Sequence, residues 1–241
     1  MVEALIFSSV DRVRVRTSPL IIEIVGLAGA GKSSVLSTLR DRGFDIVYID
    51  AFRQKTNVPF YIASSLSLLP TLVCEWARGT PCSLREMNWM IRLHAMRHIL
   101  QRQTSRGGAT VVLDQGPIHT LVKLRYYDAE ISRGPCYSRW RARIIEQWAT
   151  SLDAIIWLDA PEDILIERIR ARKKWHSLKE KSEREAKELL TRSRVIYKEV
   201  VSDILAHGAL TLLSFDTSEQ APPRIVGGIL ASLGLVEEQI E

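Results

Sequence analysis

A glycine-rich segment near the start of the chain has the composition and spacing of a phosphate-binding loop. It consists of Gly26, Leu27, Ala28, Gly29, Ala30, Gly31, Lys32 and Ser33, followed directly by Ser34. Glycines let a backbone wrap closely around phosphate, and the N–H groups of the loop and of a following helix point at it. Lys32 would reach the outer phosphates and Ser33 would bind Mg²⁺. The pattern predicts a site for ATP and Mg²⁺, although such a spacing also arises by chance.

Two aspartates follow apolar segments that read as strands. Asp114 comes after residues 111–113, and Asp50 ends the second apolar segment, with Arg53 close behind. The carboxyl ends of parallel strands face the ligand crevice of an α/β sheet. Asp114 would therefore hold Mg²⁺ or accept a proton, while Asp50 would take a proton from a substrate hydroxyl and Arg53 would bind a substrate anion. Alternatively, Asp114 caps the next helix and Asp50 is an ordinary turn residue.

A basic segment follows the fourth apolar strand. Arg168 and Arg172 are four residues apart and share a face if the segment is helical, whereas Arg170 points elsewhere. Arginines beside transferring phosphates neutralise the charge of the transition state, because the planar guanidinium matches phosphate oxygens. We expect Arg168 and Arg172 to be catalytic, with a solvated basic helix as the alternative.

The elements that must position these residues alternate along the chain. Apolar runs predict strands at 21–25, 44–49, 109–113, 154–158 and 209–213. Helical spacing predicts helices at 31–40, 59–78, 83–104, 118–125, 137–148 and 179–206, and a last one capped by Thr217 or Ser218. This order is typical of an α/β fold with a parallel sheet and helices on both faces. We expect one domain at 20–241, preceded by an arm at 1–19.

The composition of the chain limits which partners and which cellular location we expect for the protein. The chain has 241 residues, a net charge of +5 and a pI of about 9.2, which fits a phosphate-bearing ligand. No nucleic-acid motif is recognised, so we expect no nucleic-acid partner. Three cysteines are too few and too scattered for a disulfide framework, which favours a reduced, cytoplasmic location. The uncharged stretch 60–74 is shorter than a membrane span, and we interpret it as a buried helix without membrane contact.

Three patterns together resemble the P-loop nucleoside and nucleotide kinases, most of all the thymidylate-kinase and deoxynucleoside-kinase branch. They are the Gly-x-x-x-x-Gly-Lys-Ser segment, Val-Val-Leu-Asp-Gln-Gly at 111–116, and Trp-Leu-Asp-Ala-Pro at 157–161 followed by Glu-Arg-Ile-x-x-Arg at 167–172. The resemblance covers about residues 20–232. It implies a P-loop NTPase fold with a five-stranded parallel sheet, ATP and Mg²⁺ as cofactors, and a helical lid at about 168–178. It also implies an adenine-side loop from Thr217 to Pro222 and a base at Asp50.

One position departs from that family. Gln115 stands where these kinases usually carry an arginine that grips the acceptor. Because glutamine carries no charge, Gln115 favours a neutral hydroxyl-bearing or non-nucleotide acceptor over a nucleotide. We expect an ATP-dependent kinase that phosphorylates a nucleoside, nucleotide or related metabolite, and leave open whether it is a homodimer.

The main rival is a regulatory nucleotide-binding NTPase or switch with no small-molecule acceptor. Against it, the chain lacks the Asn-Lys-x-Asp guanine motif, and Gln115 stands where a motor ATPase has glutamate.

Overall fold

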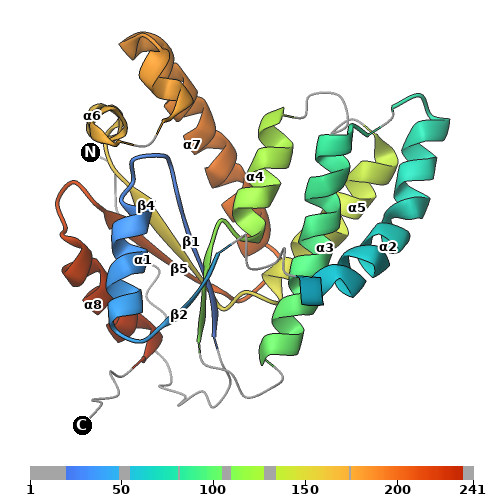
Figure 1. Cartoon of the computed structure of the whole chain (residues 1–241), viewed down its shortest axis with the longest axis horizontal. Helices are drawn as coiled ribbons and strands as arrows, with labels where there is room; N and C mark the ends of the chain where they lie inside the picture. The colour runs from blue at the N-terminus through green and yellow to red at the C-terminus, as the bar shows by residue number, and fades with distance from the viewer. Residues whose placement is uncertain are drawn as a thin grey trace.

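A five-stranded sheet forms the centre of the molecule (Figure 1). The computed structural model describes residues 20–48, 55–80, 82–104, 110–127, 134–173 and 175–235. The strands are β1 (Ile21–Gly26), β2 (Asp45–Tyr48), β3 (Val111–Asp114), β4 (Ala154–Asp159) and β5 (Thr211–Asp216). All pair in parallel, in the order β2-β3-β1-β4-β5. The predicted α/β fold with a five-stranded parallel sheet is confirmed.

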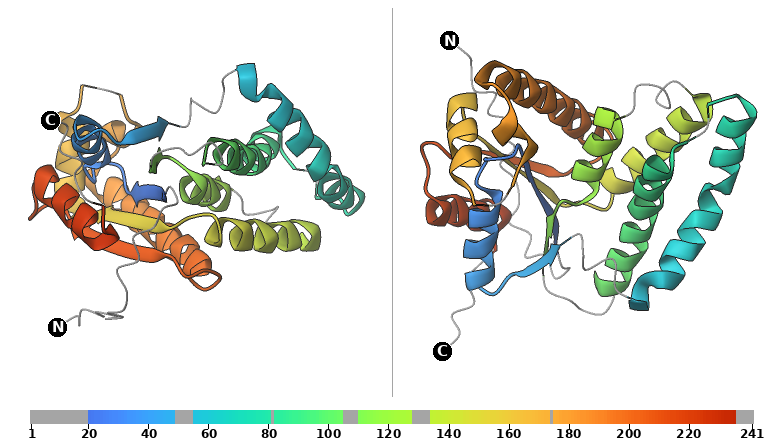
Figure 2. Two further views of the ribbon diagram at one scale, coloured as in Figure 1. Left: turned by 90° about the horizontal axis from the view of Figure 1, so that it is seen from below. Right: turned by 45° about the horizontal axis from the view of Figure 1, so that its top comes forward.

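Helices cover both faces of the sheet. They are α1 (Lys32–Asp41), α2 (Val58–Ala77), α3 (Leu84–Thr104), α4 (Pro117–Tyr127), α5 (Pro135–Ala149), α6 (Glu162–Ala171), α7 (Glu183–Leu205) and α8 (Pro222–Leu233). Figure 2 shows α1 and α8 on one side of the sheet and α4, α5 and α7 on the other, with α3 and then α2 farther out. This arrangement leaves the carboxyl ends of β1, β3 and β4 free to carry a site.

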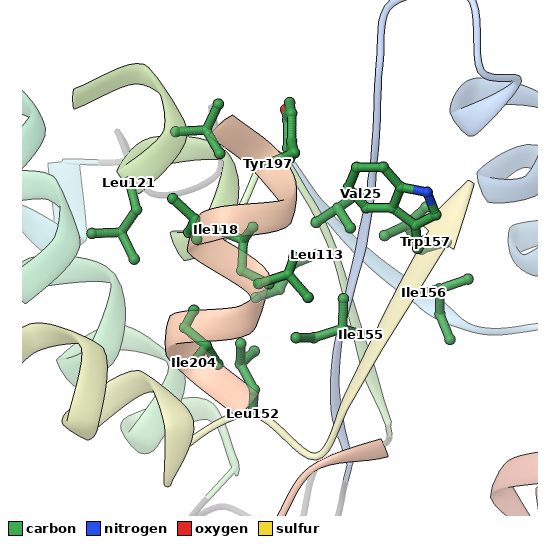
Figure 3. Packing of buried hydrophobic residues seen from close by; sticks show 14 of the residues in the cluster. Val25, Leu113, Ile118, Leu121, Leu152, Ile155, Ile156, Trp157, Tyr197 and Ile204 are labelled. Atoms are coloured by element: carbon green, nitrogen blue, oxygen red, sulfur yellow. The ribbon is translucent and has the colours of Figure 1, made fainter. Parts of the chain in front are cut away.

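The core lies between the sheet and the α4–α7 layer. Leu113 of β3 and Ile155 of β4, the strands on either side of β1, are fully buried and face Ile118 of α4 and Ile204 of α7 (Figure 3). Each such side chain contributes about 1.5–3 kcal/mol when it leaves water. For the central strands β1, β3 and β4, both faces are buried, which explains the near-continuous apolar runs predicted from the sequence.

Helix α2 corrects one expectation. The stretch 60–74 was expected to be a buried helix, yet most of α2 is exposed, and only Ser64, Leu68 and Glu75 of it are buried. Nothing in the described part of the chain covers its outer face. It is also the one described helix whose length and composition would allow a membrane span, a criterion that core helices pass as well. The prediction of an apolar helix is therefore confirmed, but the prediction that this helix is buried is wrong.

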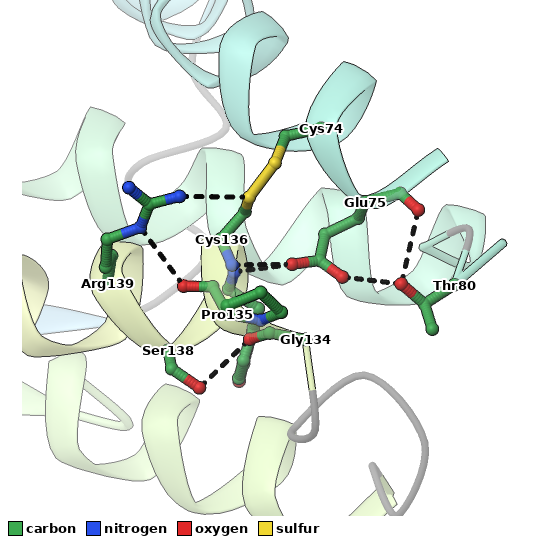
Figure 4. Close-up of a disulfide and its surroundings, with 9 residues drawn as sticks. Cys74, Glu75, Thr80, Gly134, Pro135, Cys136, Ser138 and Arg139 are labelled. Atoms are coloured by element: carbon green, nitrogen blue, oxygen red, sulfur yellow. Dashed lines mark hydrogen bonds between the residues drawn. A yellow bond between two sulfur atoms is a disulfide. The ribbon is translucent and has the colours of Figure 1, made fainter. Parts of the chain in front are cut away.

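A second correction concerns the cysteines. The structure joins Cys74 of α2 to Cys136 of α5 in a disulfide, with Cα atoms 6.3 Å apart (Figure 4). The sequence separation of 62 residues conceals that these two helices pack together. Cys82 is free. The scattered cysteines therefore no longer support a reduced, cytoplasmic location, which stays a prediction.

Beside the disulfide, Glu75 fixes the start of α5 to α2. Its buried carboxylate accepts hydrogen bonds from the backbone N–H groups of Cys136 and Tyr137, at 2.9 and 2.8 Å, and from the hydroxyl of Thr80. These donors hold the pKa of Glu75 below its usual value, although burial opposes them. A Cβ on Gly134 would lie 1.8 Å from the Glu75 carboxylate, so only glycine fits there.

Two helix boundaries also differ from expectation. The helix predicted at 179–206 begins instead at Glu183, after a separate 3₁₀ turn at Ser177–Glu180. Its start is set by a capping box, in which Ser182 and Glu185 exchange side-chain-to-backbone hydrogen bonds. Neither Thr217 nor Ser218 caps the last helix, because α8 begins at Pro222 with Ala221 as its N-cap.

Candidate active site

The glycine-rich loop connects β1 to α1, the context that phosphate binding requires. Gly26, Gly29 and Gly31 have positive φ angles of 150°, 88° and 76°. A Cβ on Gly26 would lie 2.2 Å from the Leu158 carbonyl oxygen, and one on Gly29 would lie 2.6 Å from that of Leu165. Sterics and conformation both require glycine in this loop.

The N-terminus of α1 is open to a ligand. Its N-cap residue is Gly31, which has no side chain to cap it, and its first turn carries no acidic residue. The first N–H groups of a helix have no partner within the helix, and the helix dipole adds positive potential there. Ser33 and Ser34 in this first turn are exposed. An anion is the natural partner of this terminus.

Lys32 lies in the middle of the loop. Its ammonium donates hydrogen bonds to the carbonyl oxygens of Gly26 and Leu27, at 2.7 and 2.8 Å. Burial lowers the pKa of Lys32 to about 8, while the nearby Asp114 carboxylate acts to raise it. Burial in turn raises the pKa of Asp114, opposed by Lys32. Strand pairing puts Asp114 beside Ile24, two residues before the loop, as the sequence predicted.

Arg168 contacts protein rather than open space. Its guanidinium donates to the hydroxyl and the carbonyl oxygen of Thr217, both at 2.8 Å, and lies 3.4 Å from the carbonyl oxygen of Gly29. Arg168 therefore holds together the glycine-rich loop, α6 and the loop after β5.

Arg172 does not share a helix face with Arg168. Helix α6 ends at Ala171, and Arg172 is its extended C-cap, with a ψ of 141°. The expectation of two arginines on one helical face is wrong, because the helix stops one residue too early. Arg172 is exposed instead, and it lines both cavities next to the glycine-rich loop.

The first cavity has a volume of 460 Å³ and lies above the carboxyl ends of β1 and β3. The loop residues Lys32 and Ser33 line it together with Asp114 and Gln115. Its other walls are His119, Val122, Lys123 and Tyr126 of α4, residues 175–178 after α6, and Leu189, Leu190, Ser193 and Tyr197 of α7. Gln115, which also lines the cavity, is exposed and has a φ of 59°, a left-handed conformation that is uncommon for non-glycine residues.

A second cavity of 430 Å³ lies on the opposite side of the loop. It is bordered by Gly29, Gly31, Ser34, Val35, Arg168, Ala171, Arg172, Thr217, Gln220, Pro222 and Ile225. The segment from Thr217 to Pro222, expected to be an adenine-side loop, thus borders a cavity that meets the glycine-rich loop. Among the residues that the structure describes, Arg172 alone borders both this cavity and the first one.

Sequence reasoning missed the pair His119 and Tyr197. The Nδ1 atom of His119 lies 2.8 Å from the Tyr197 hydroxyl, and both side chains face the first cavity. Burial lowers the pKa of His119 to about 3, with Lys123 and Lys32 adding to the effect, so the imidazole is neutral. Burial also raises the pKa of Tyr197. The residues are 78 positions apart, and no sequence pattern joins them.

Glu23 positions this pair from within the sheet. Its buried carboxylate accepts hydrogen bonds from the backbone N–H groups of Ile118 and His119, at 2.9 and 3.0 Å. Burial raises the pKa of Glu23 to about 8, although these donors oppose the change. A charged residue in the apolar run of β1 was the signal that could have identified it.

The arrangement fits Mg²⁺. The exposed Ser33 and the half-buried Asp114 border the same cavity, and Mg²⁺ in phosphoryl-transfer sites typically takes one or two protein oxygens along with phosphates and water. Asp50 and Arg53, expected to serve as base and anion ligand, lie outside the described residues.

Comparison with known proteins agrees with this fold. The sequence profile of the AAA domain family (AAA_33) matches residues 21–196, more than half of the chain. Deoxyadenosine kinase from M. mycoides with bound dATP is 18% identical, with a TM-score of 0.51 over 89% of this chain and 100% of its own. YorR protein from Bacillus subtilis, in complex with phosphorylated GDP, is 14% identical, with a TM-score of 0.51 over 89% of this chain and 96% of its own.

No curated protein matches the chain significantly by sequence. At these identities the likeness to solved structures bears on the fold alone. The matching profile establishes the family independently of them. The chain belongs to the AAA domain family and has the P-loop fold of the nucleoside and nucleotide kinases.

Proposed function

We propose that this protein is an ATP-dependent small-molecule kinase, which transfers the γ-phosphoryl group to a nucleoside, a nucleotide or a related metabolite. The observation that carries the proposal is the position of the glycine-rich loop between two cavities of 430 and 460 Å³. A kinase needs one space for the donor's base and another for the acceptor, with the phosphates between them. A regulatory nucleotide-binding switch needs only the space for the base of its nucleotide.

The donor would bind across the loop. Its base would occupy the cavity beside Thr217, and its phosphates would lie on the open N-terminus of α1. The phosphates would draw the Lys32 ammonium away from the carbonyls of Gly26 and Leu27, since an anion is the stronger partner. Mg²⁺, held by Ser33 and Asp114, would neutralise charge on the outer phosphates.

The acceptor would enter the larger cavity. Its hydroxyl oxygen forms the new bond to the γ-phosphorus, the bond from that phosphorus to the bridging oxygen breaks, and ADP leaves. The hydroxyl proton passes to Asp50 or to Asp114. Burial raises the pKa of Asp114, and a carboxylate with a raised pKa accepts a proton more readily than one with an ordinary pKa.

The side chains around this cavity suit a polar acceptor with a flat group. Neutral His119 and the Tyr197 hydroxyl offer hydrogen bonds, while Tyr126 and Trp175 offer aromatic surface. Arg172, between the two cavities, would contact the transferring group, and closure of the segment around it would exclude water.

Transfer of label from ATP tests the proposal. The protein is incubated with Mg²⁺ and γ-labelled ATP against panels of nucleosides, nucleotides and phosphorylated metabolites. We expect label on one acceptor class, faster than release of inorganic phosphate. The Lys32→Ala variant, run in parallel, should transfer none. Release of phosphate at one rate whatever the acceptor would instead establish the rival, a regulatory NTPase.

A further inference from the structure

His119 of α4 and Tyr197 of α7 form one hydrogen-bonded unit in the wall of the first cavity. The Nδ1 atom of His119 lies 2.8 Å from the Tyr197 hydroxyl oxygen, and the centroids of the two rings are 6.5 Å apart. Both side chains line the cavity in which we place the acceptor. We call these two residues the His119–Tyr197 pair. A group of the acceptor that binds against the pair would contact α4 and α7 at once.

The sheet holds both members of the pair in place. Glu23 of β1 accepts hydrogen bonds from the backbone N–H groups of Ile118 and His119, which fixes the first turn of α4. Tyr197 is only 6% exposed, and its ring packs edge-on against Trp157 of β4 with centroids 5.8 Å apart (Figure 3). Side chains fixed in this way lose little conformational freedom when a ligand binds, so the pair is preorganised for binding.

Hydrogen bonding, rather than proton transfer, is the chemistry available to the pair. Burial lowers the pKa of His119 to about 3, and the charges of Lys123 and Lys32 act in the same direction, so the ring is neutral. Burial likewise raises the pKa of Tyr197, so its hydroxyl keeps its proton. A general base needs a pKa near the working pH, and His119 is therefore unsuited to take the proton of the acceptor hydroxyl.

The hydrogens of the pair can be counted. A neutral imidazole carries one N–H and a phenol carries one O–H, and one of these two hydrogens lies between Nδ1 and the hydroxyl oxygen. If the Tyr197 hydroxyl donates it, Nε2 of His119 carries the other hydrogen and the phenol oxygen can still accept. If Nδ1 donates it, the hydroxyl hydrogen is left to donate and Nε2 accepts. In either tautomer the pair offers one donor and one acceptor.

This combination distinguishes between classes of ligand group. A hydroxyl or an amide edge both donates and accepts, so it can satisfy both members of the pair. An ionised phosphate or carboxylate only accepts and an ammonium only donates, so each would leave one member without a partner. A polar group left unsatisfied in this way lowers affinity by about 10- to 100-fold. Gln115, which lines the same cavity, is also uncharged and also both donates and accepts.

We propose that the His119–Tyr197 pair determines the specificity for the acceptor, by binding an uncharged group of the acceptor that both donates and accepts a hydrogen bond, such as a hydroxyl or an amide edge. The inference rests on the proposed function, because only a kinase has a phosphoryl acceptor. The pair positions the acceptor by this group, and its two residues exchange no proton with the reacting hydroxyl.

Kinetics with modified acceptors test the pair. The probes are nucleosides and their 5′-monophosphates, each offered beside analogues in which one hydroxyl is replaced by hydrogen or one ring N–H by N-methyl. We expect the wild type to prefer the parent compound over one such analogue by about 10- to 100-fold in kcat/KM. Tyr197→Phe and His119→Phe should each lose this preference and leave the KM for ATP unchanged. The double variant should lose no more than either single variant, because the pair acts as one unit.

Two further variants exclude a purely structural role. His119→Gln, whose amide both donates and accepts, should recover most of the preference that His119→Phe loses. Thr191→Val removes an exposed hydroxyl from α7, outside the described lining of the cavity, and should behave as the wild type. If the pair only ties α4 to α7, its variants would instead lower the free energy of unfolding and raise the KM of ATP and of acceptor together, with the preference among analogues intact. That result would overturn the proposal.

Binding measured without turnover separates this inference from the proposed function. Protein labelled with ¹⁵N-histidine gives an imidazole signal for His119, which is assigned by its loss in His119→Gln. We expect a nucleoside or monophosphate to shift this signal, and the analogue that lacks the bound group to leave it in place. A shift without label transfer from ATP would support the pair and disprove the kinase. Label transfer with a His119 signal that no probe moves would overturn the pair and leave the kinase standing.

Discussion

Arg168 of α6 donates hydrogen bonds to both the hydroxyl and the carbonyl oxygen of Thr217, which lies 49 residues later in the loop after β5. The same guanidinium approaches the carbonyl of Gly29. One half-buried side chain thus holds three segments around the cavity where we place the donor's base. This contact changes what a substitution at Arg168 should do.

Arg168→Ala should weaken both the fold and ATP binding. Hydrogen bonds from a charged group contribute about 1.5–3 kcal/mol, and without them the loop at Thr217 loses its anchor. Urea denaturation should show a lower free energy of unfolding, and calorimetry a higher Kd for ATP. A variant with normal stability and normal ATP affinity but slow turnover would show that Arg168 acts on the transition state instead, as the sequence first indicated.

Arg172→Ala should behave in the opposite way. Arg172 is exposed and borders both cavities, so its loss should leave stability and ATP affinity nearly unchanged while turnover falls by a factor on the order of 10³. The matched control is Arg170→Ala, an exposed arginine that borders neither cavity. Equal kcat values for the two variants would mean that this segment is only a solvated basic surface.

Lys32→Ala should abolish phosphoryl transfer without unfolding the protein. The ammonium is the one flexible charge in the glycine-rich loop, and it donates hydrogen bonds to the carbonyls of Gly26 and Leu27, which belong to the loop itself. Without it the outer phosphates lose their positioning charge. Label transfer and circular dichroism are measured on the same sample. Wild-type turnover with a native spectrum would disprove the assignment of the loop.

Asp114→Asn should raise the Mg²⁺ concentration needed for half-maximal turnover or remove activity altogether. The asparagine keeps the shape but loses the charge that binds the metal. Since the Asp114 carboxylate acts to raise the pKa of Lys32, the substitution should also lower that pKa below its value of about 8. Titration of turnover with Mg²⁺, together with the pH dependence of ATP binding, measures both effects. An unchanged Mg²⁺ requirement would mean that another oxygen ligand, and not Asp114, binds the metal.

Glu23 should make stability depend on pH. Burial raises its pKa from 4.5 to about 8 in the folded protein, so the folded state holds a proton that the unfolded state releases. The contribution to stability is complete below 4.5 and is lost as the pH rises through 8. Glu23→Gln cannot titrate, and its free energy of unfolding should fall less over this range. Parallel slopes for wild type and variant in urea denaturation would mean that the hydrogen bonds from α4 keep Glu23 ionised.

The strands and the nucleotide side of the site were predictable because local patterns determine them. The run at 21–25 is apolar on both faces apart from Glu23, and the loop after it needs glycines at fixed spacing. Placing Asp114 next to that loop required only the rule that parallel strands end at one edge of the sheet.

What could not be predicted depends on contacts between distant segments. His119 and Tyr197 meet across 78 residues, and Cys74 and Cys136 across 62. Composition showed that α2 is apolar but not whether another element covers it, so its exposure was missed. The end of α6 at Ala171 was missed because a basic run continues past it, and charge alone does not mark where a helix stops.

The closeness of Glu75 to Gly134 has a consequence for how this sequence can vary. A side chain at position 134 would occupy the space of the Glu75 carboxylate, and a shorter side chain at position 75 would leave the N–H groups of Cys136 and Tyr137 without their acceptor. Neither residue can therefore be exchanged alone without loss. Among homologous chains, positions 75 and 134 should covary, although 59 residues separate them in the sequence and neither belongs to a catalytic motif.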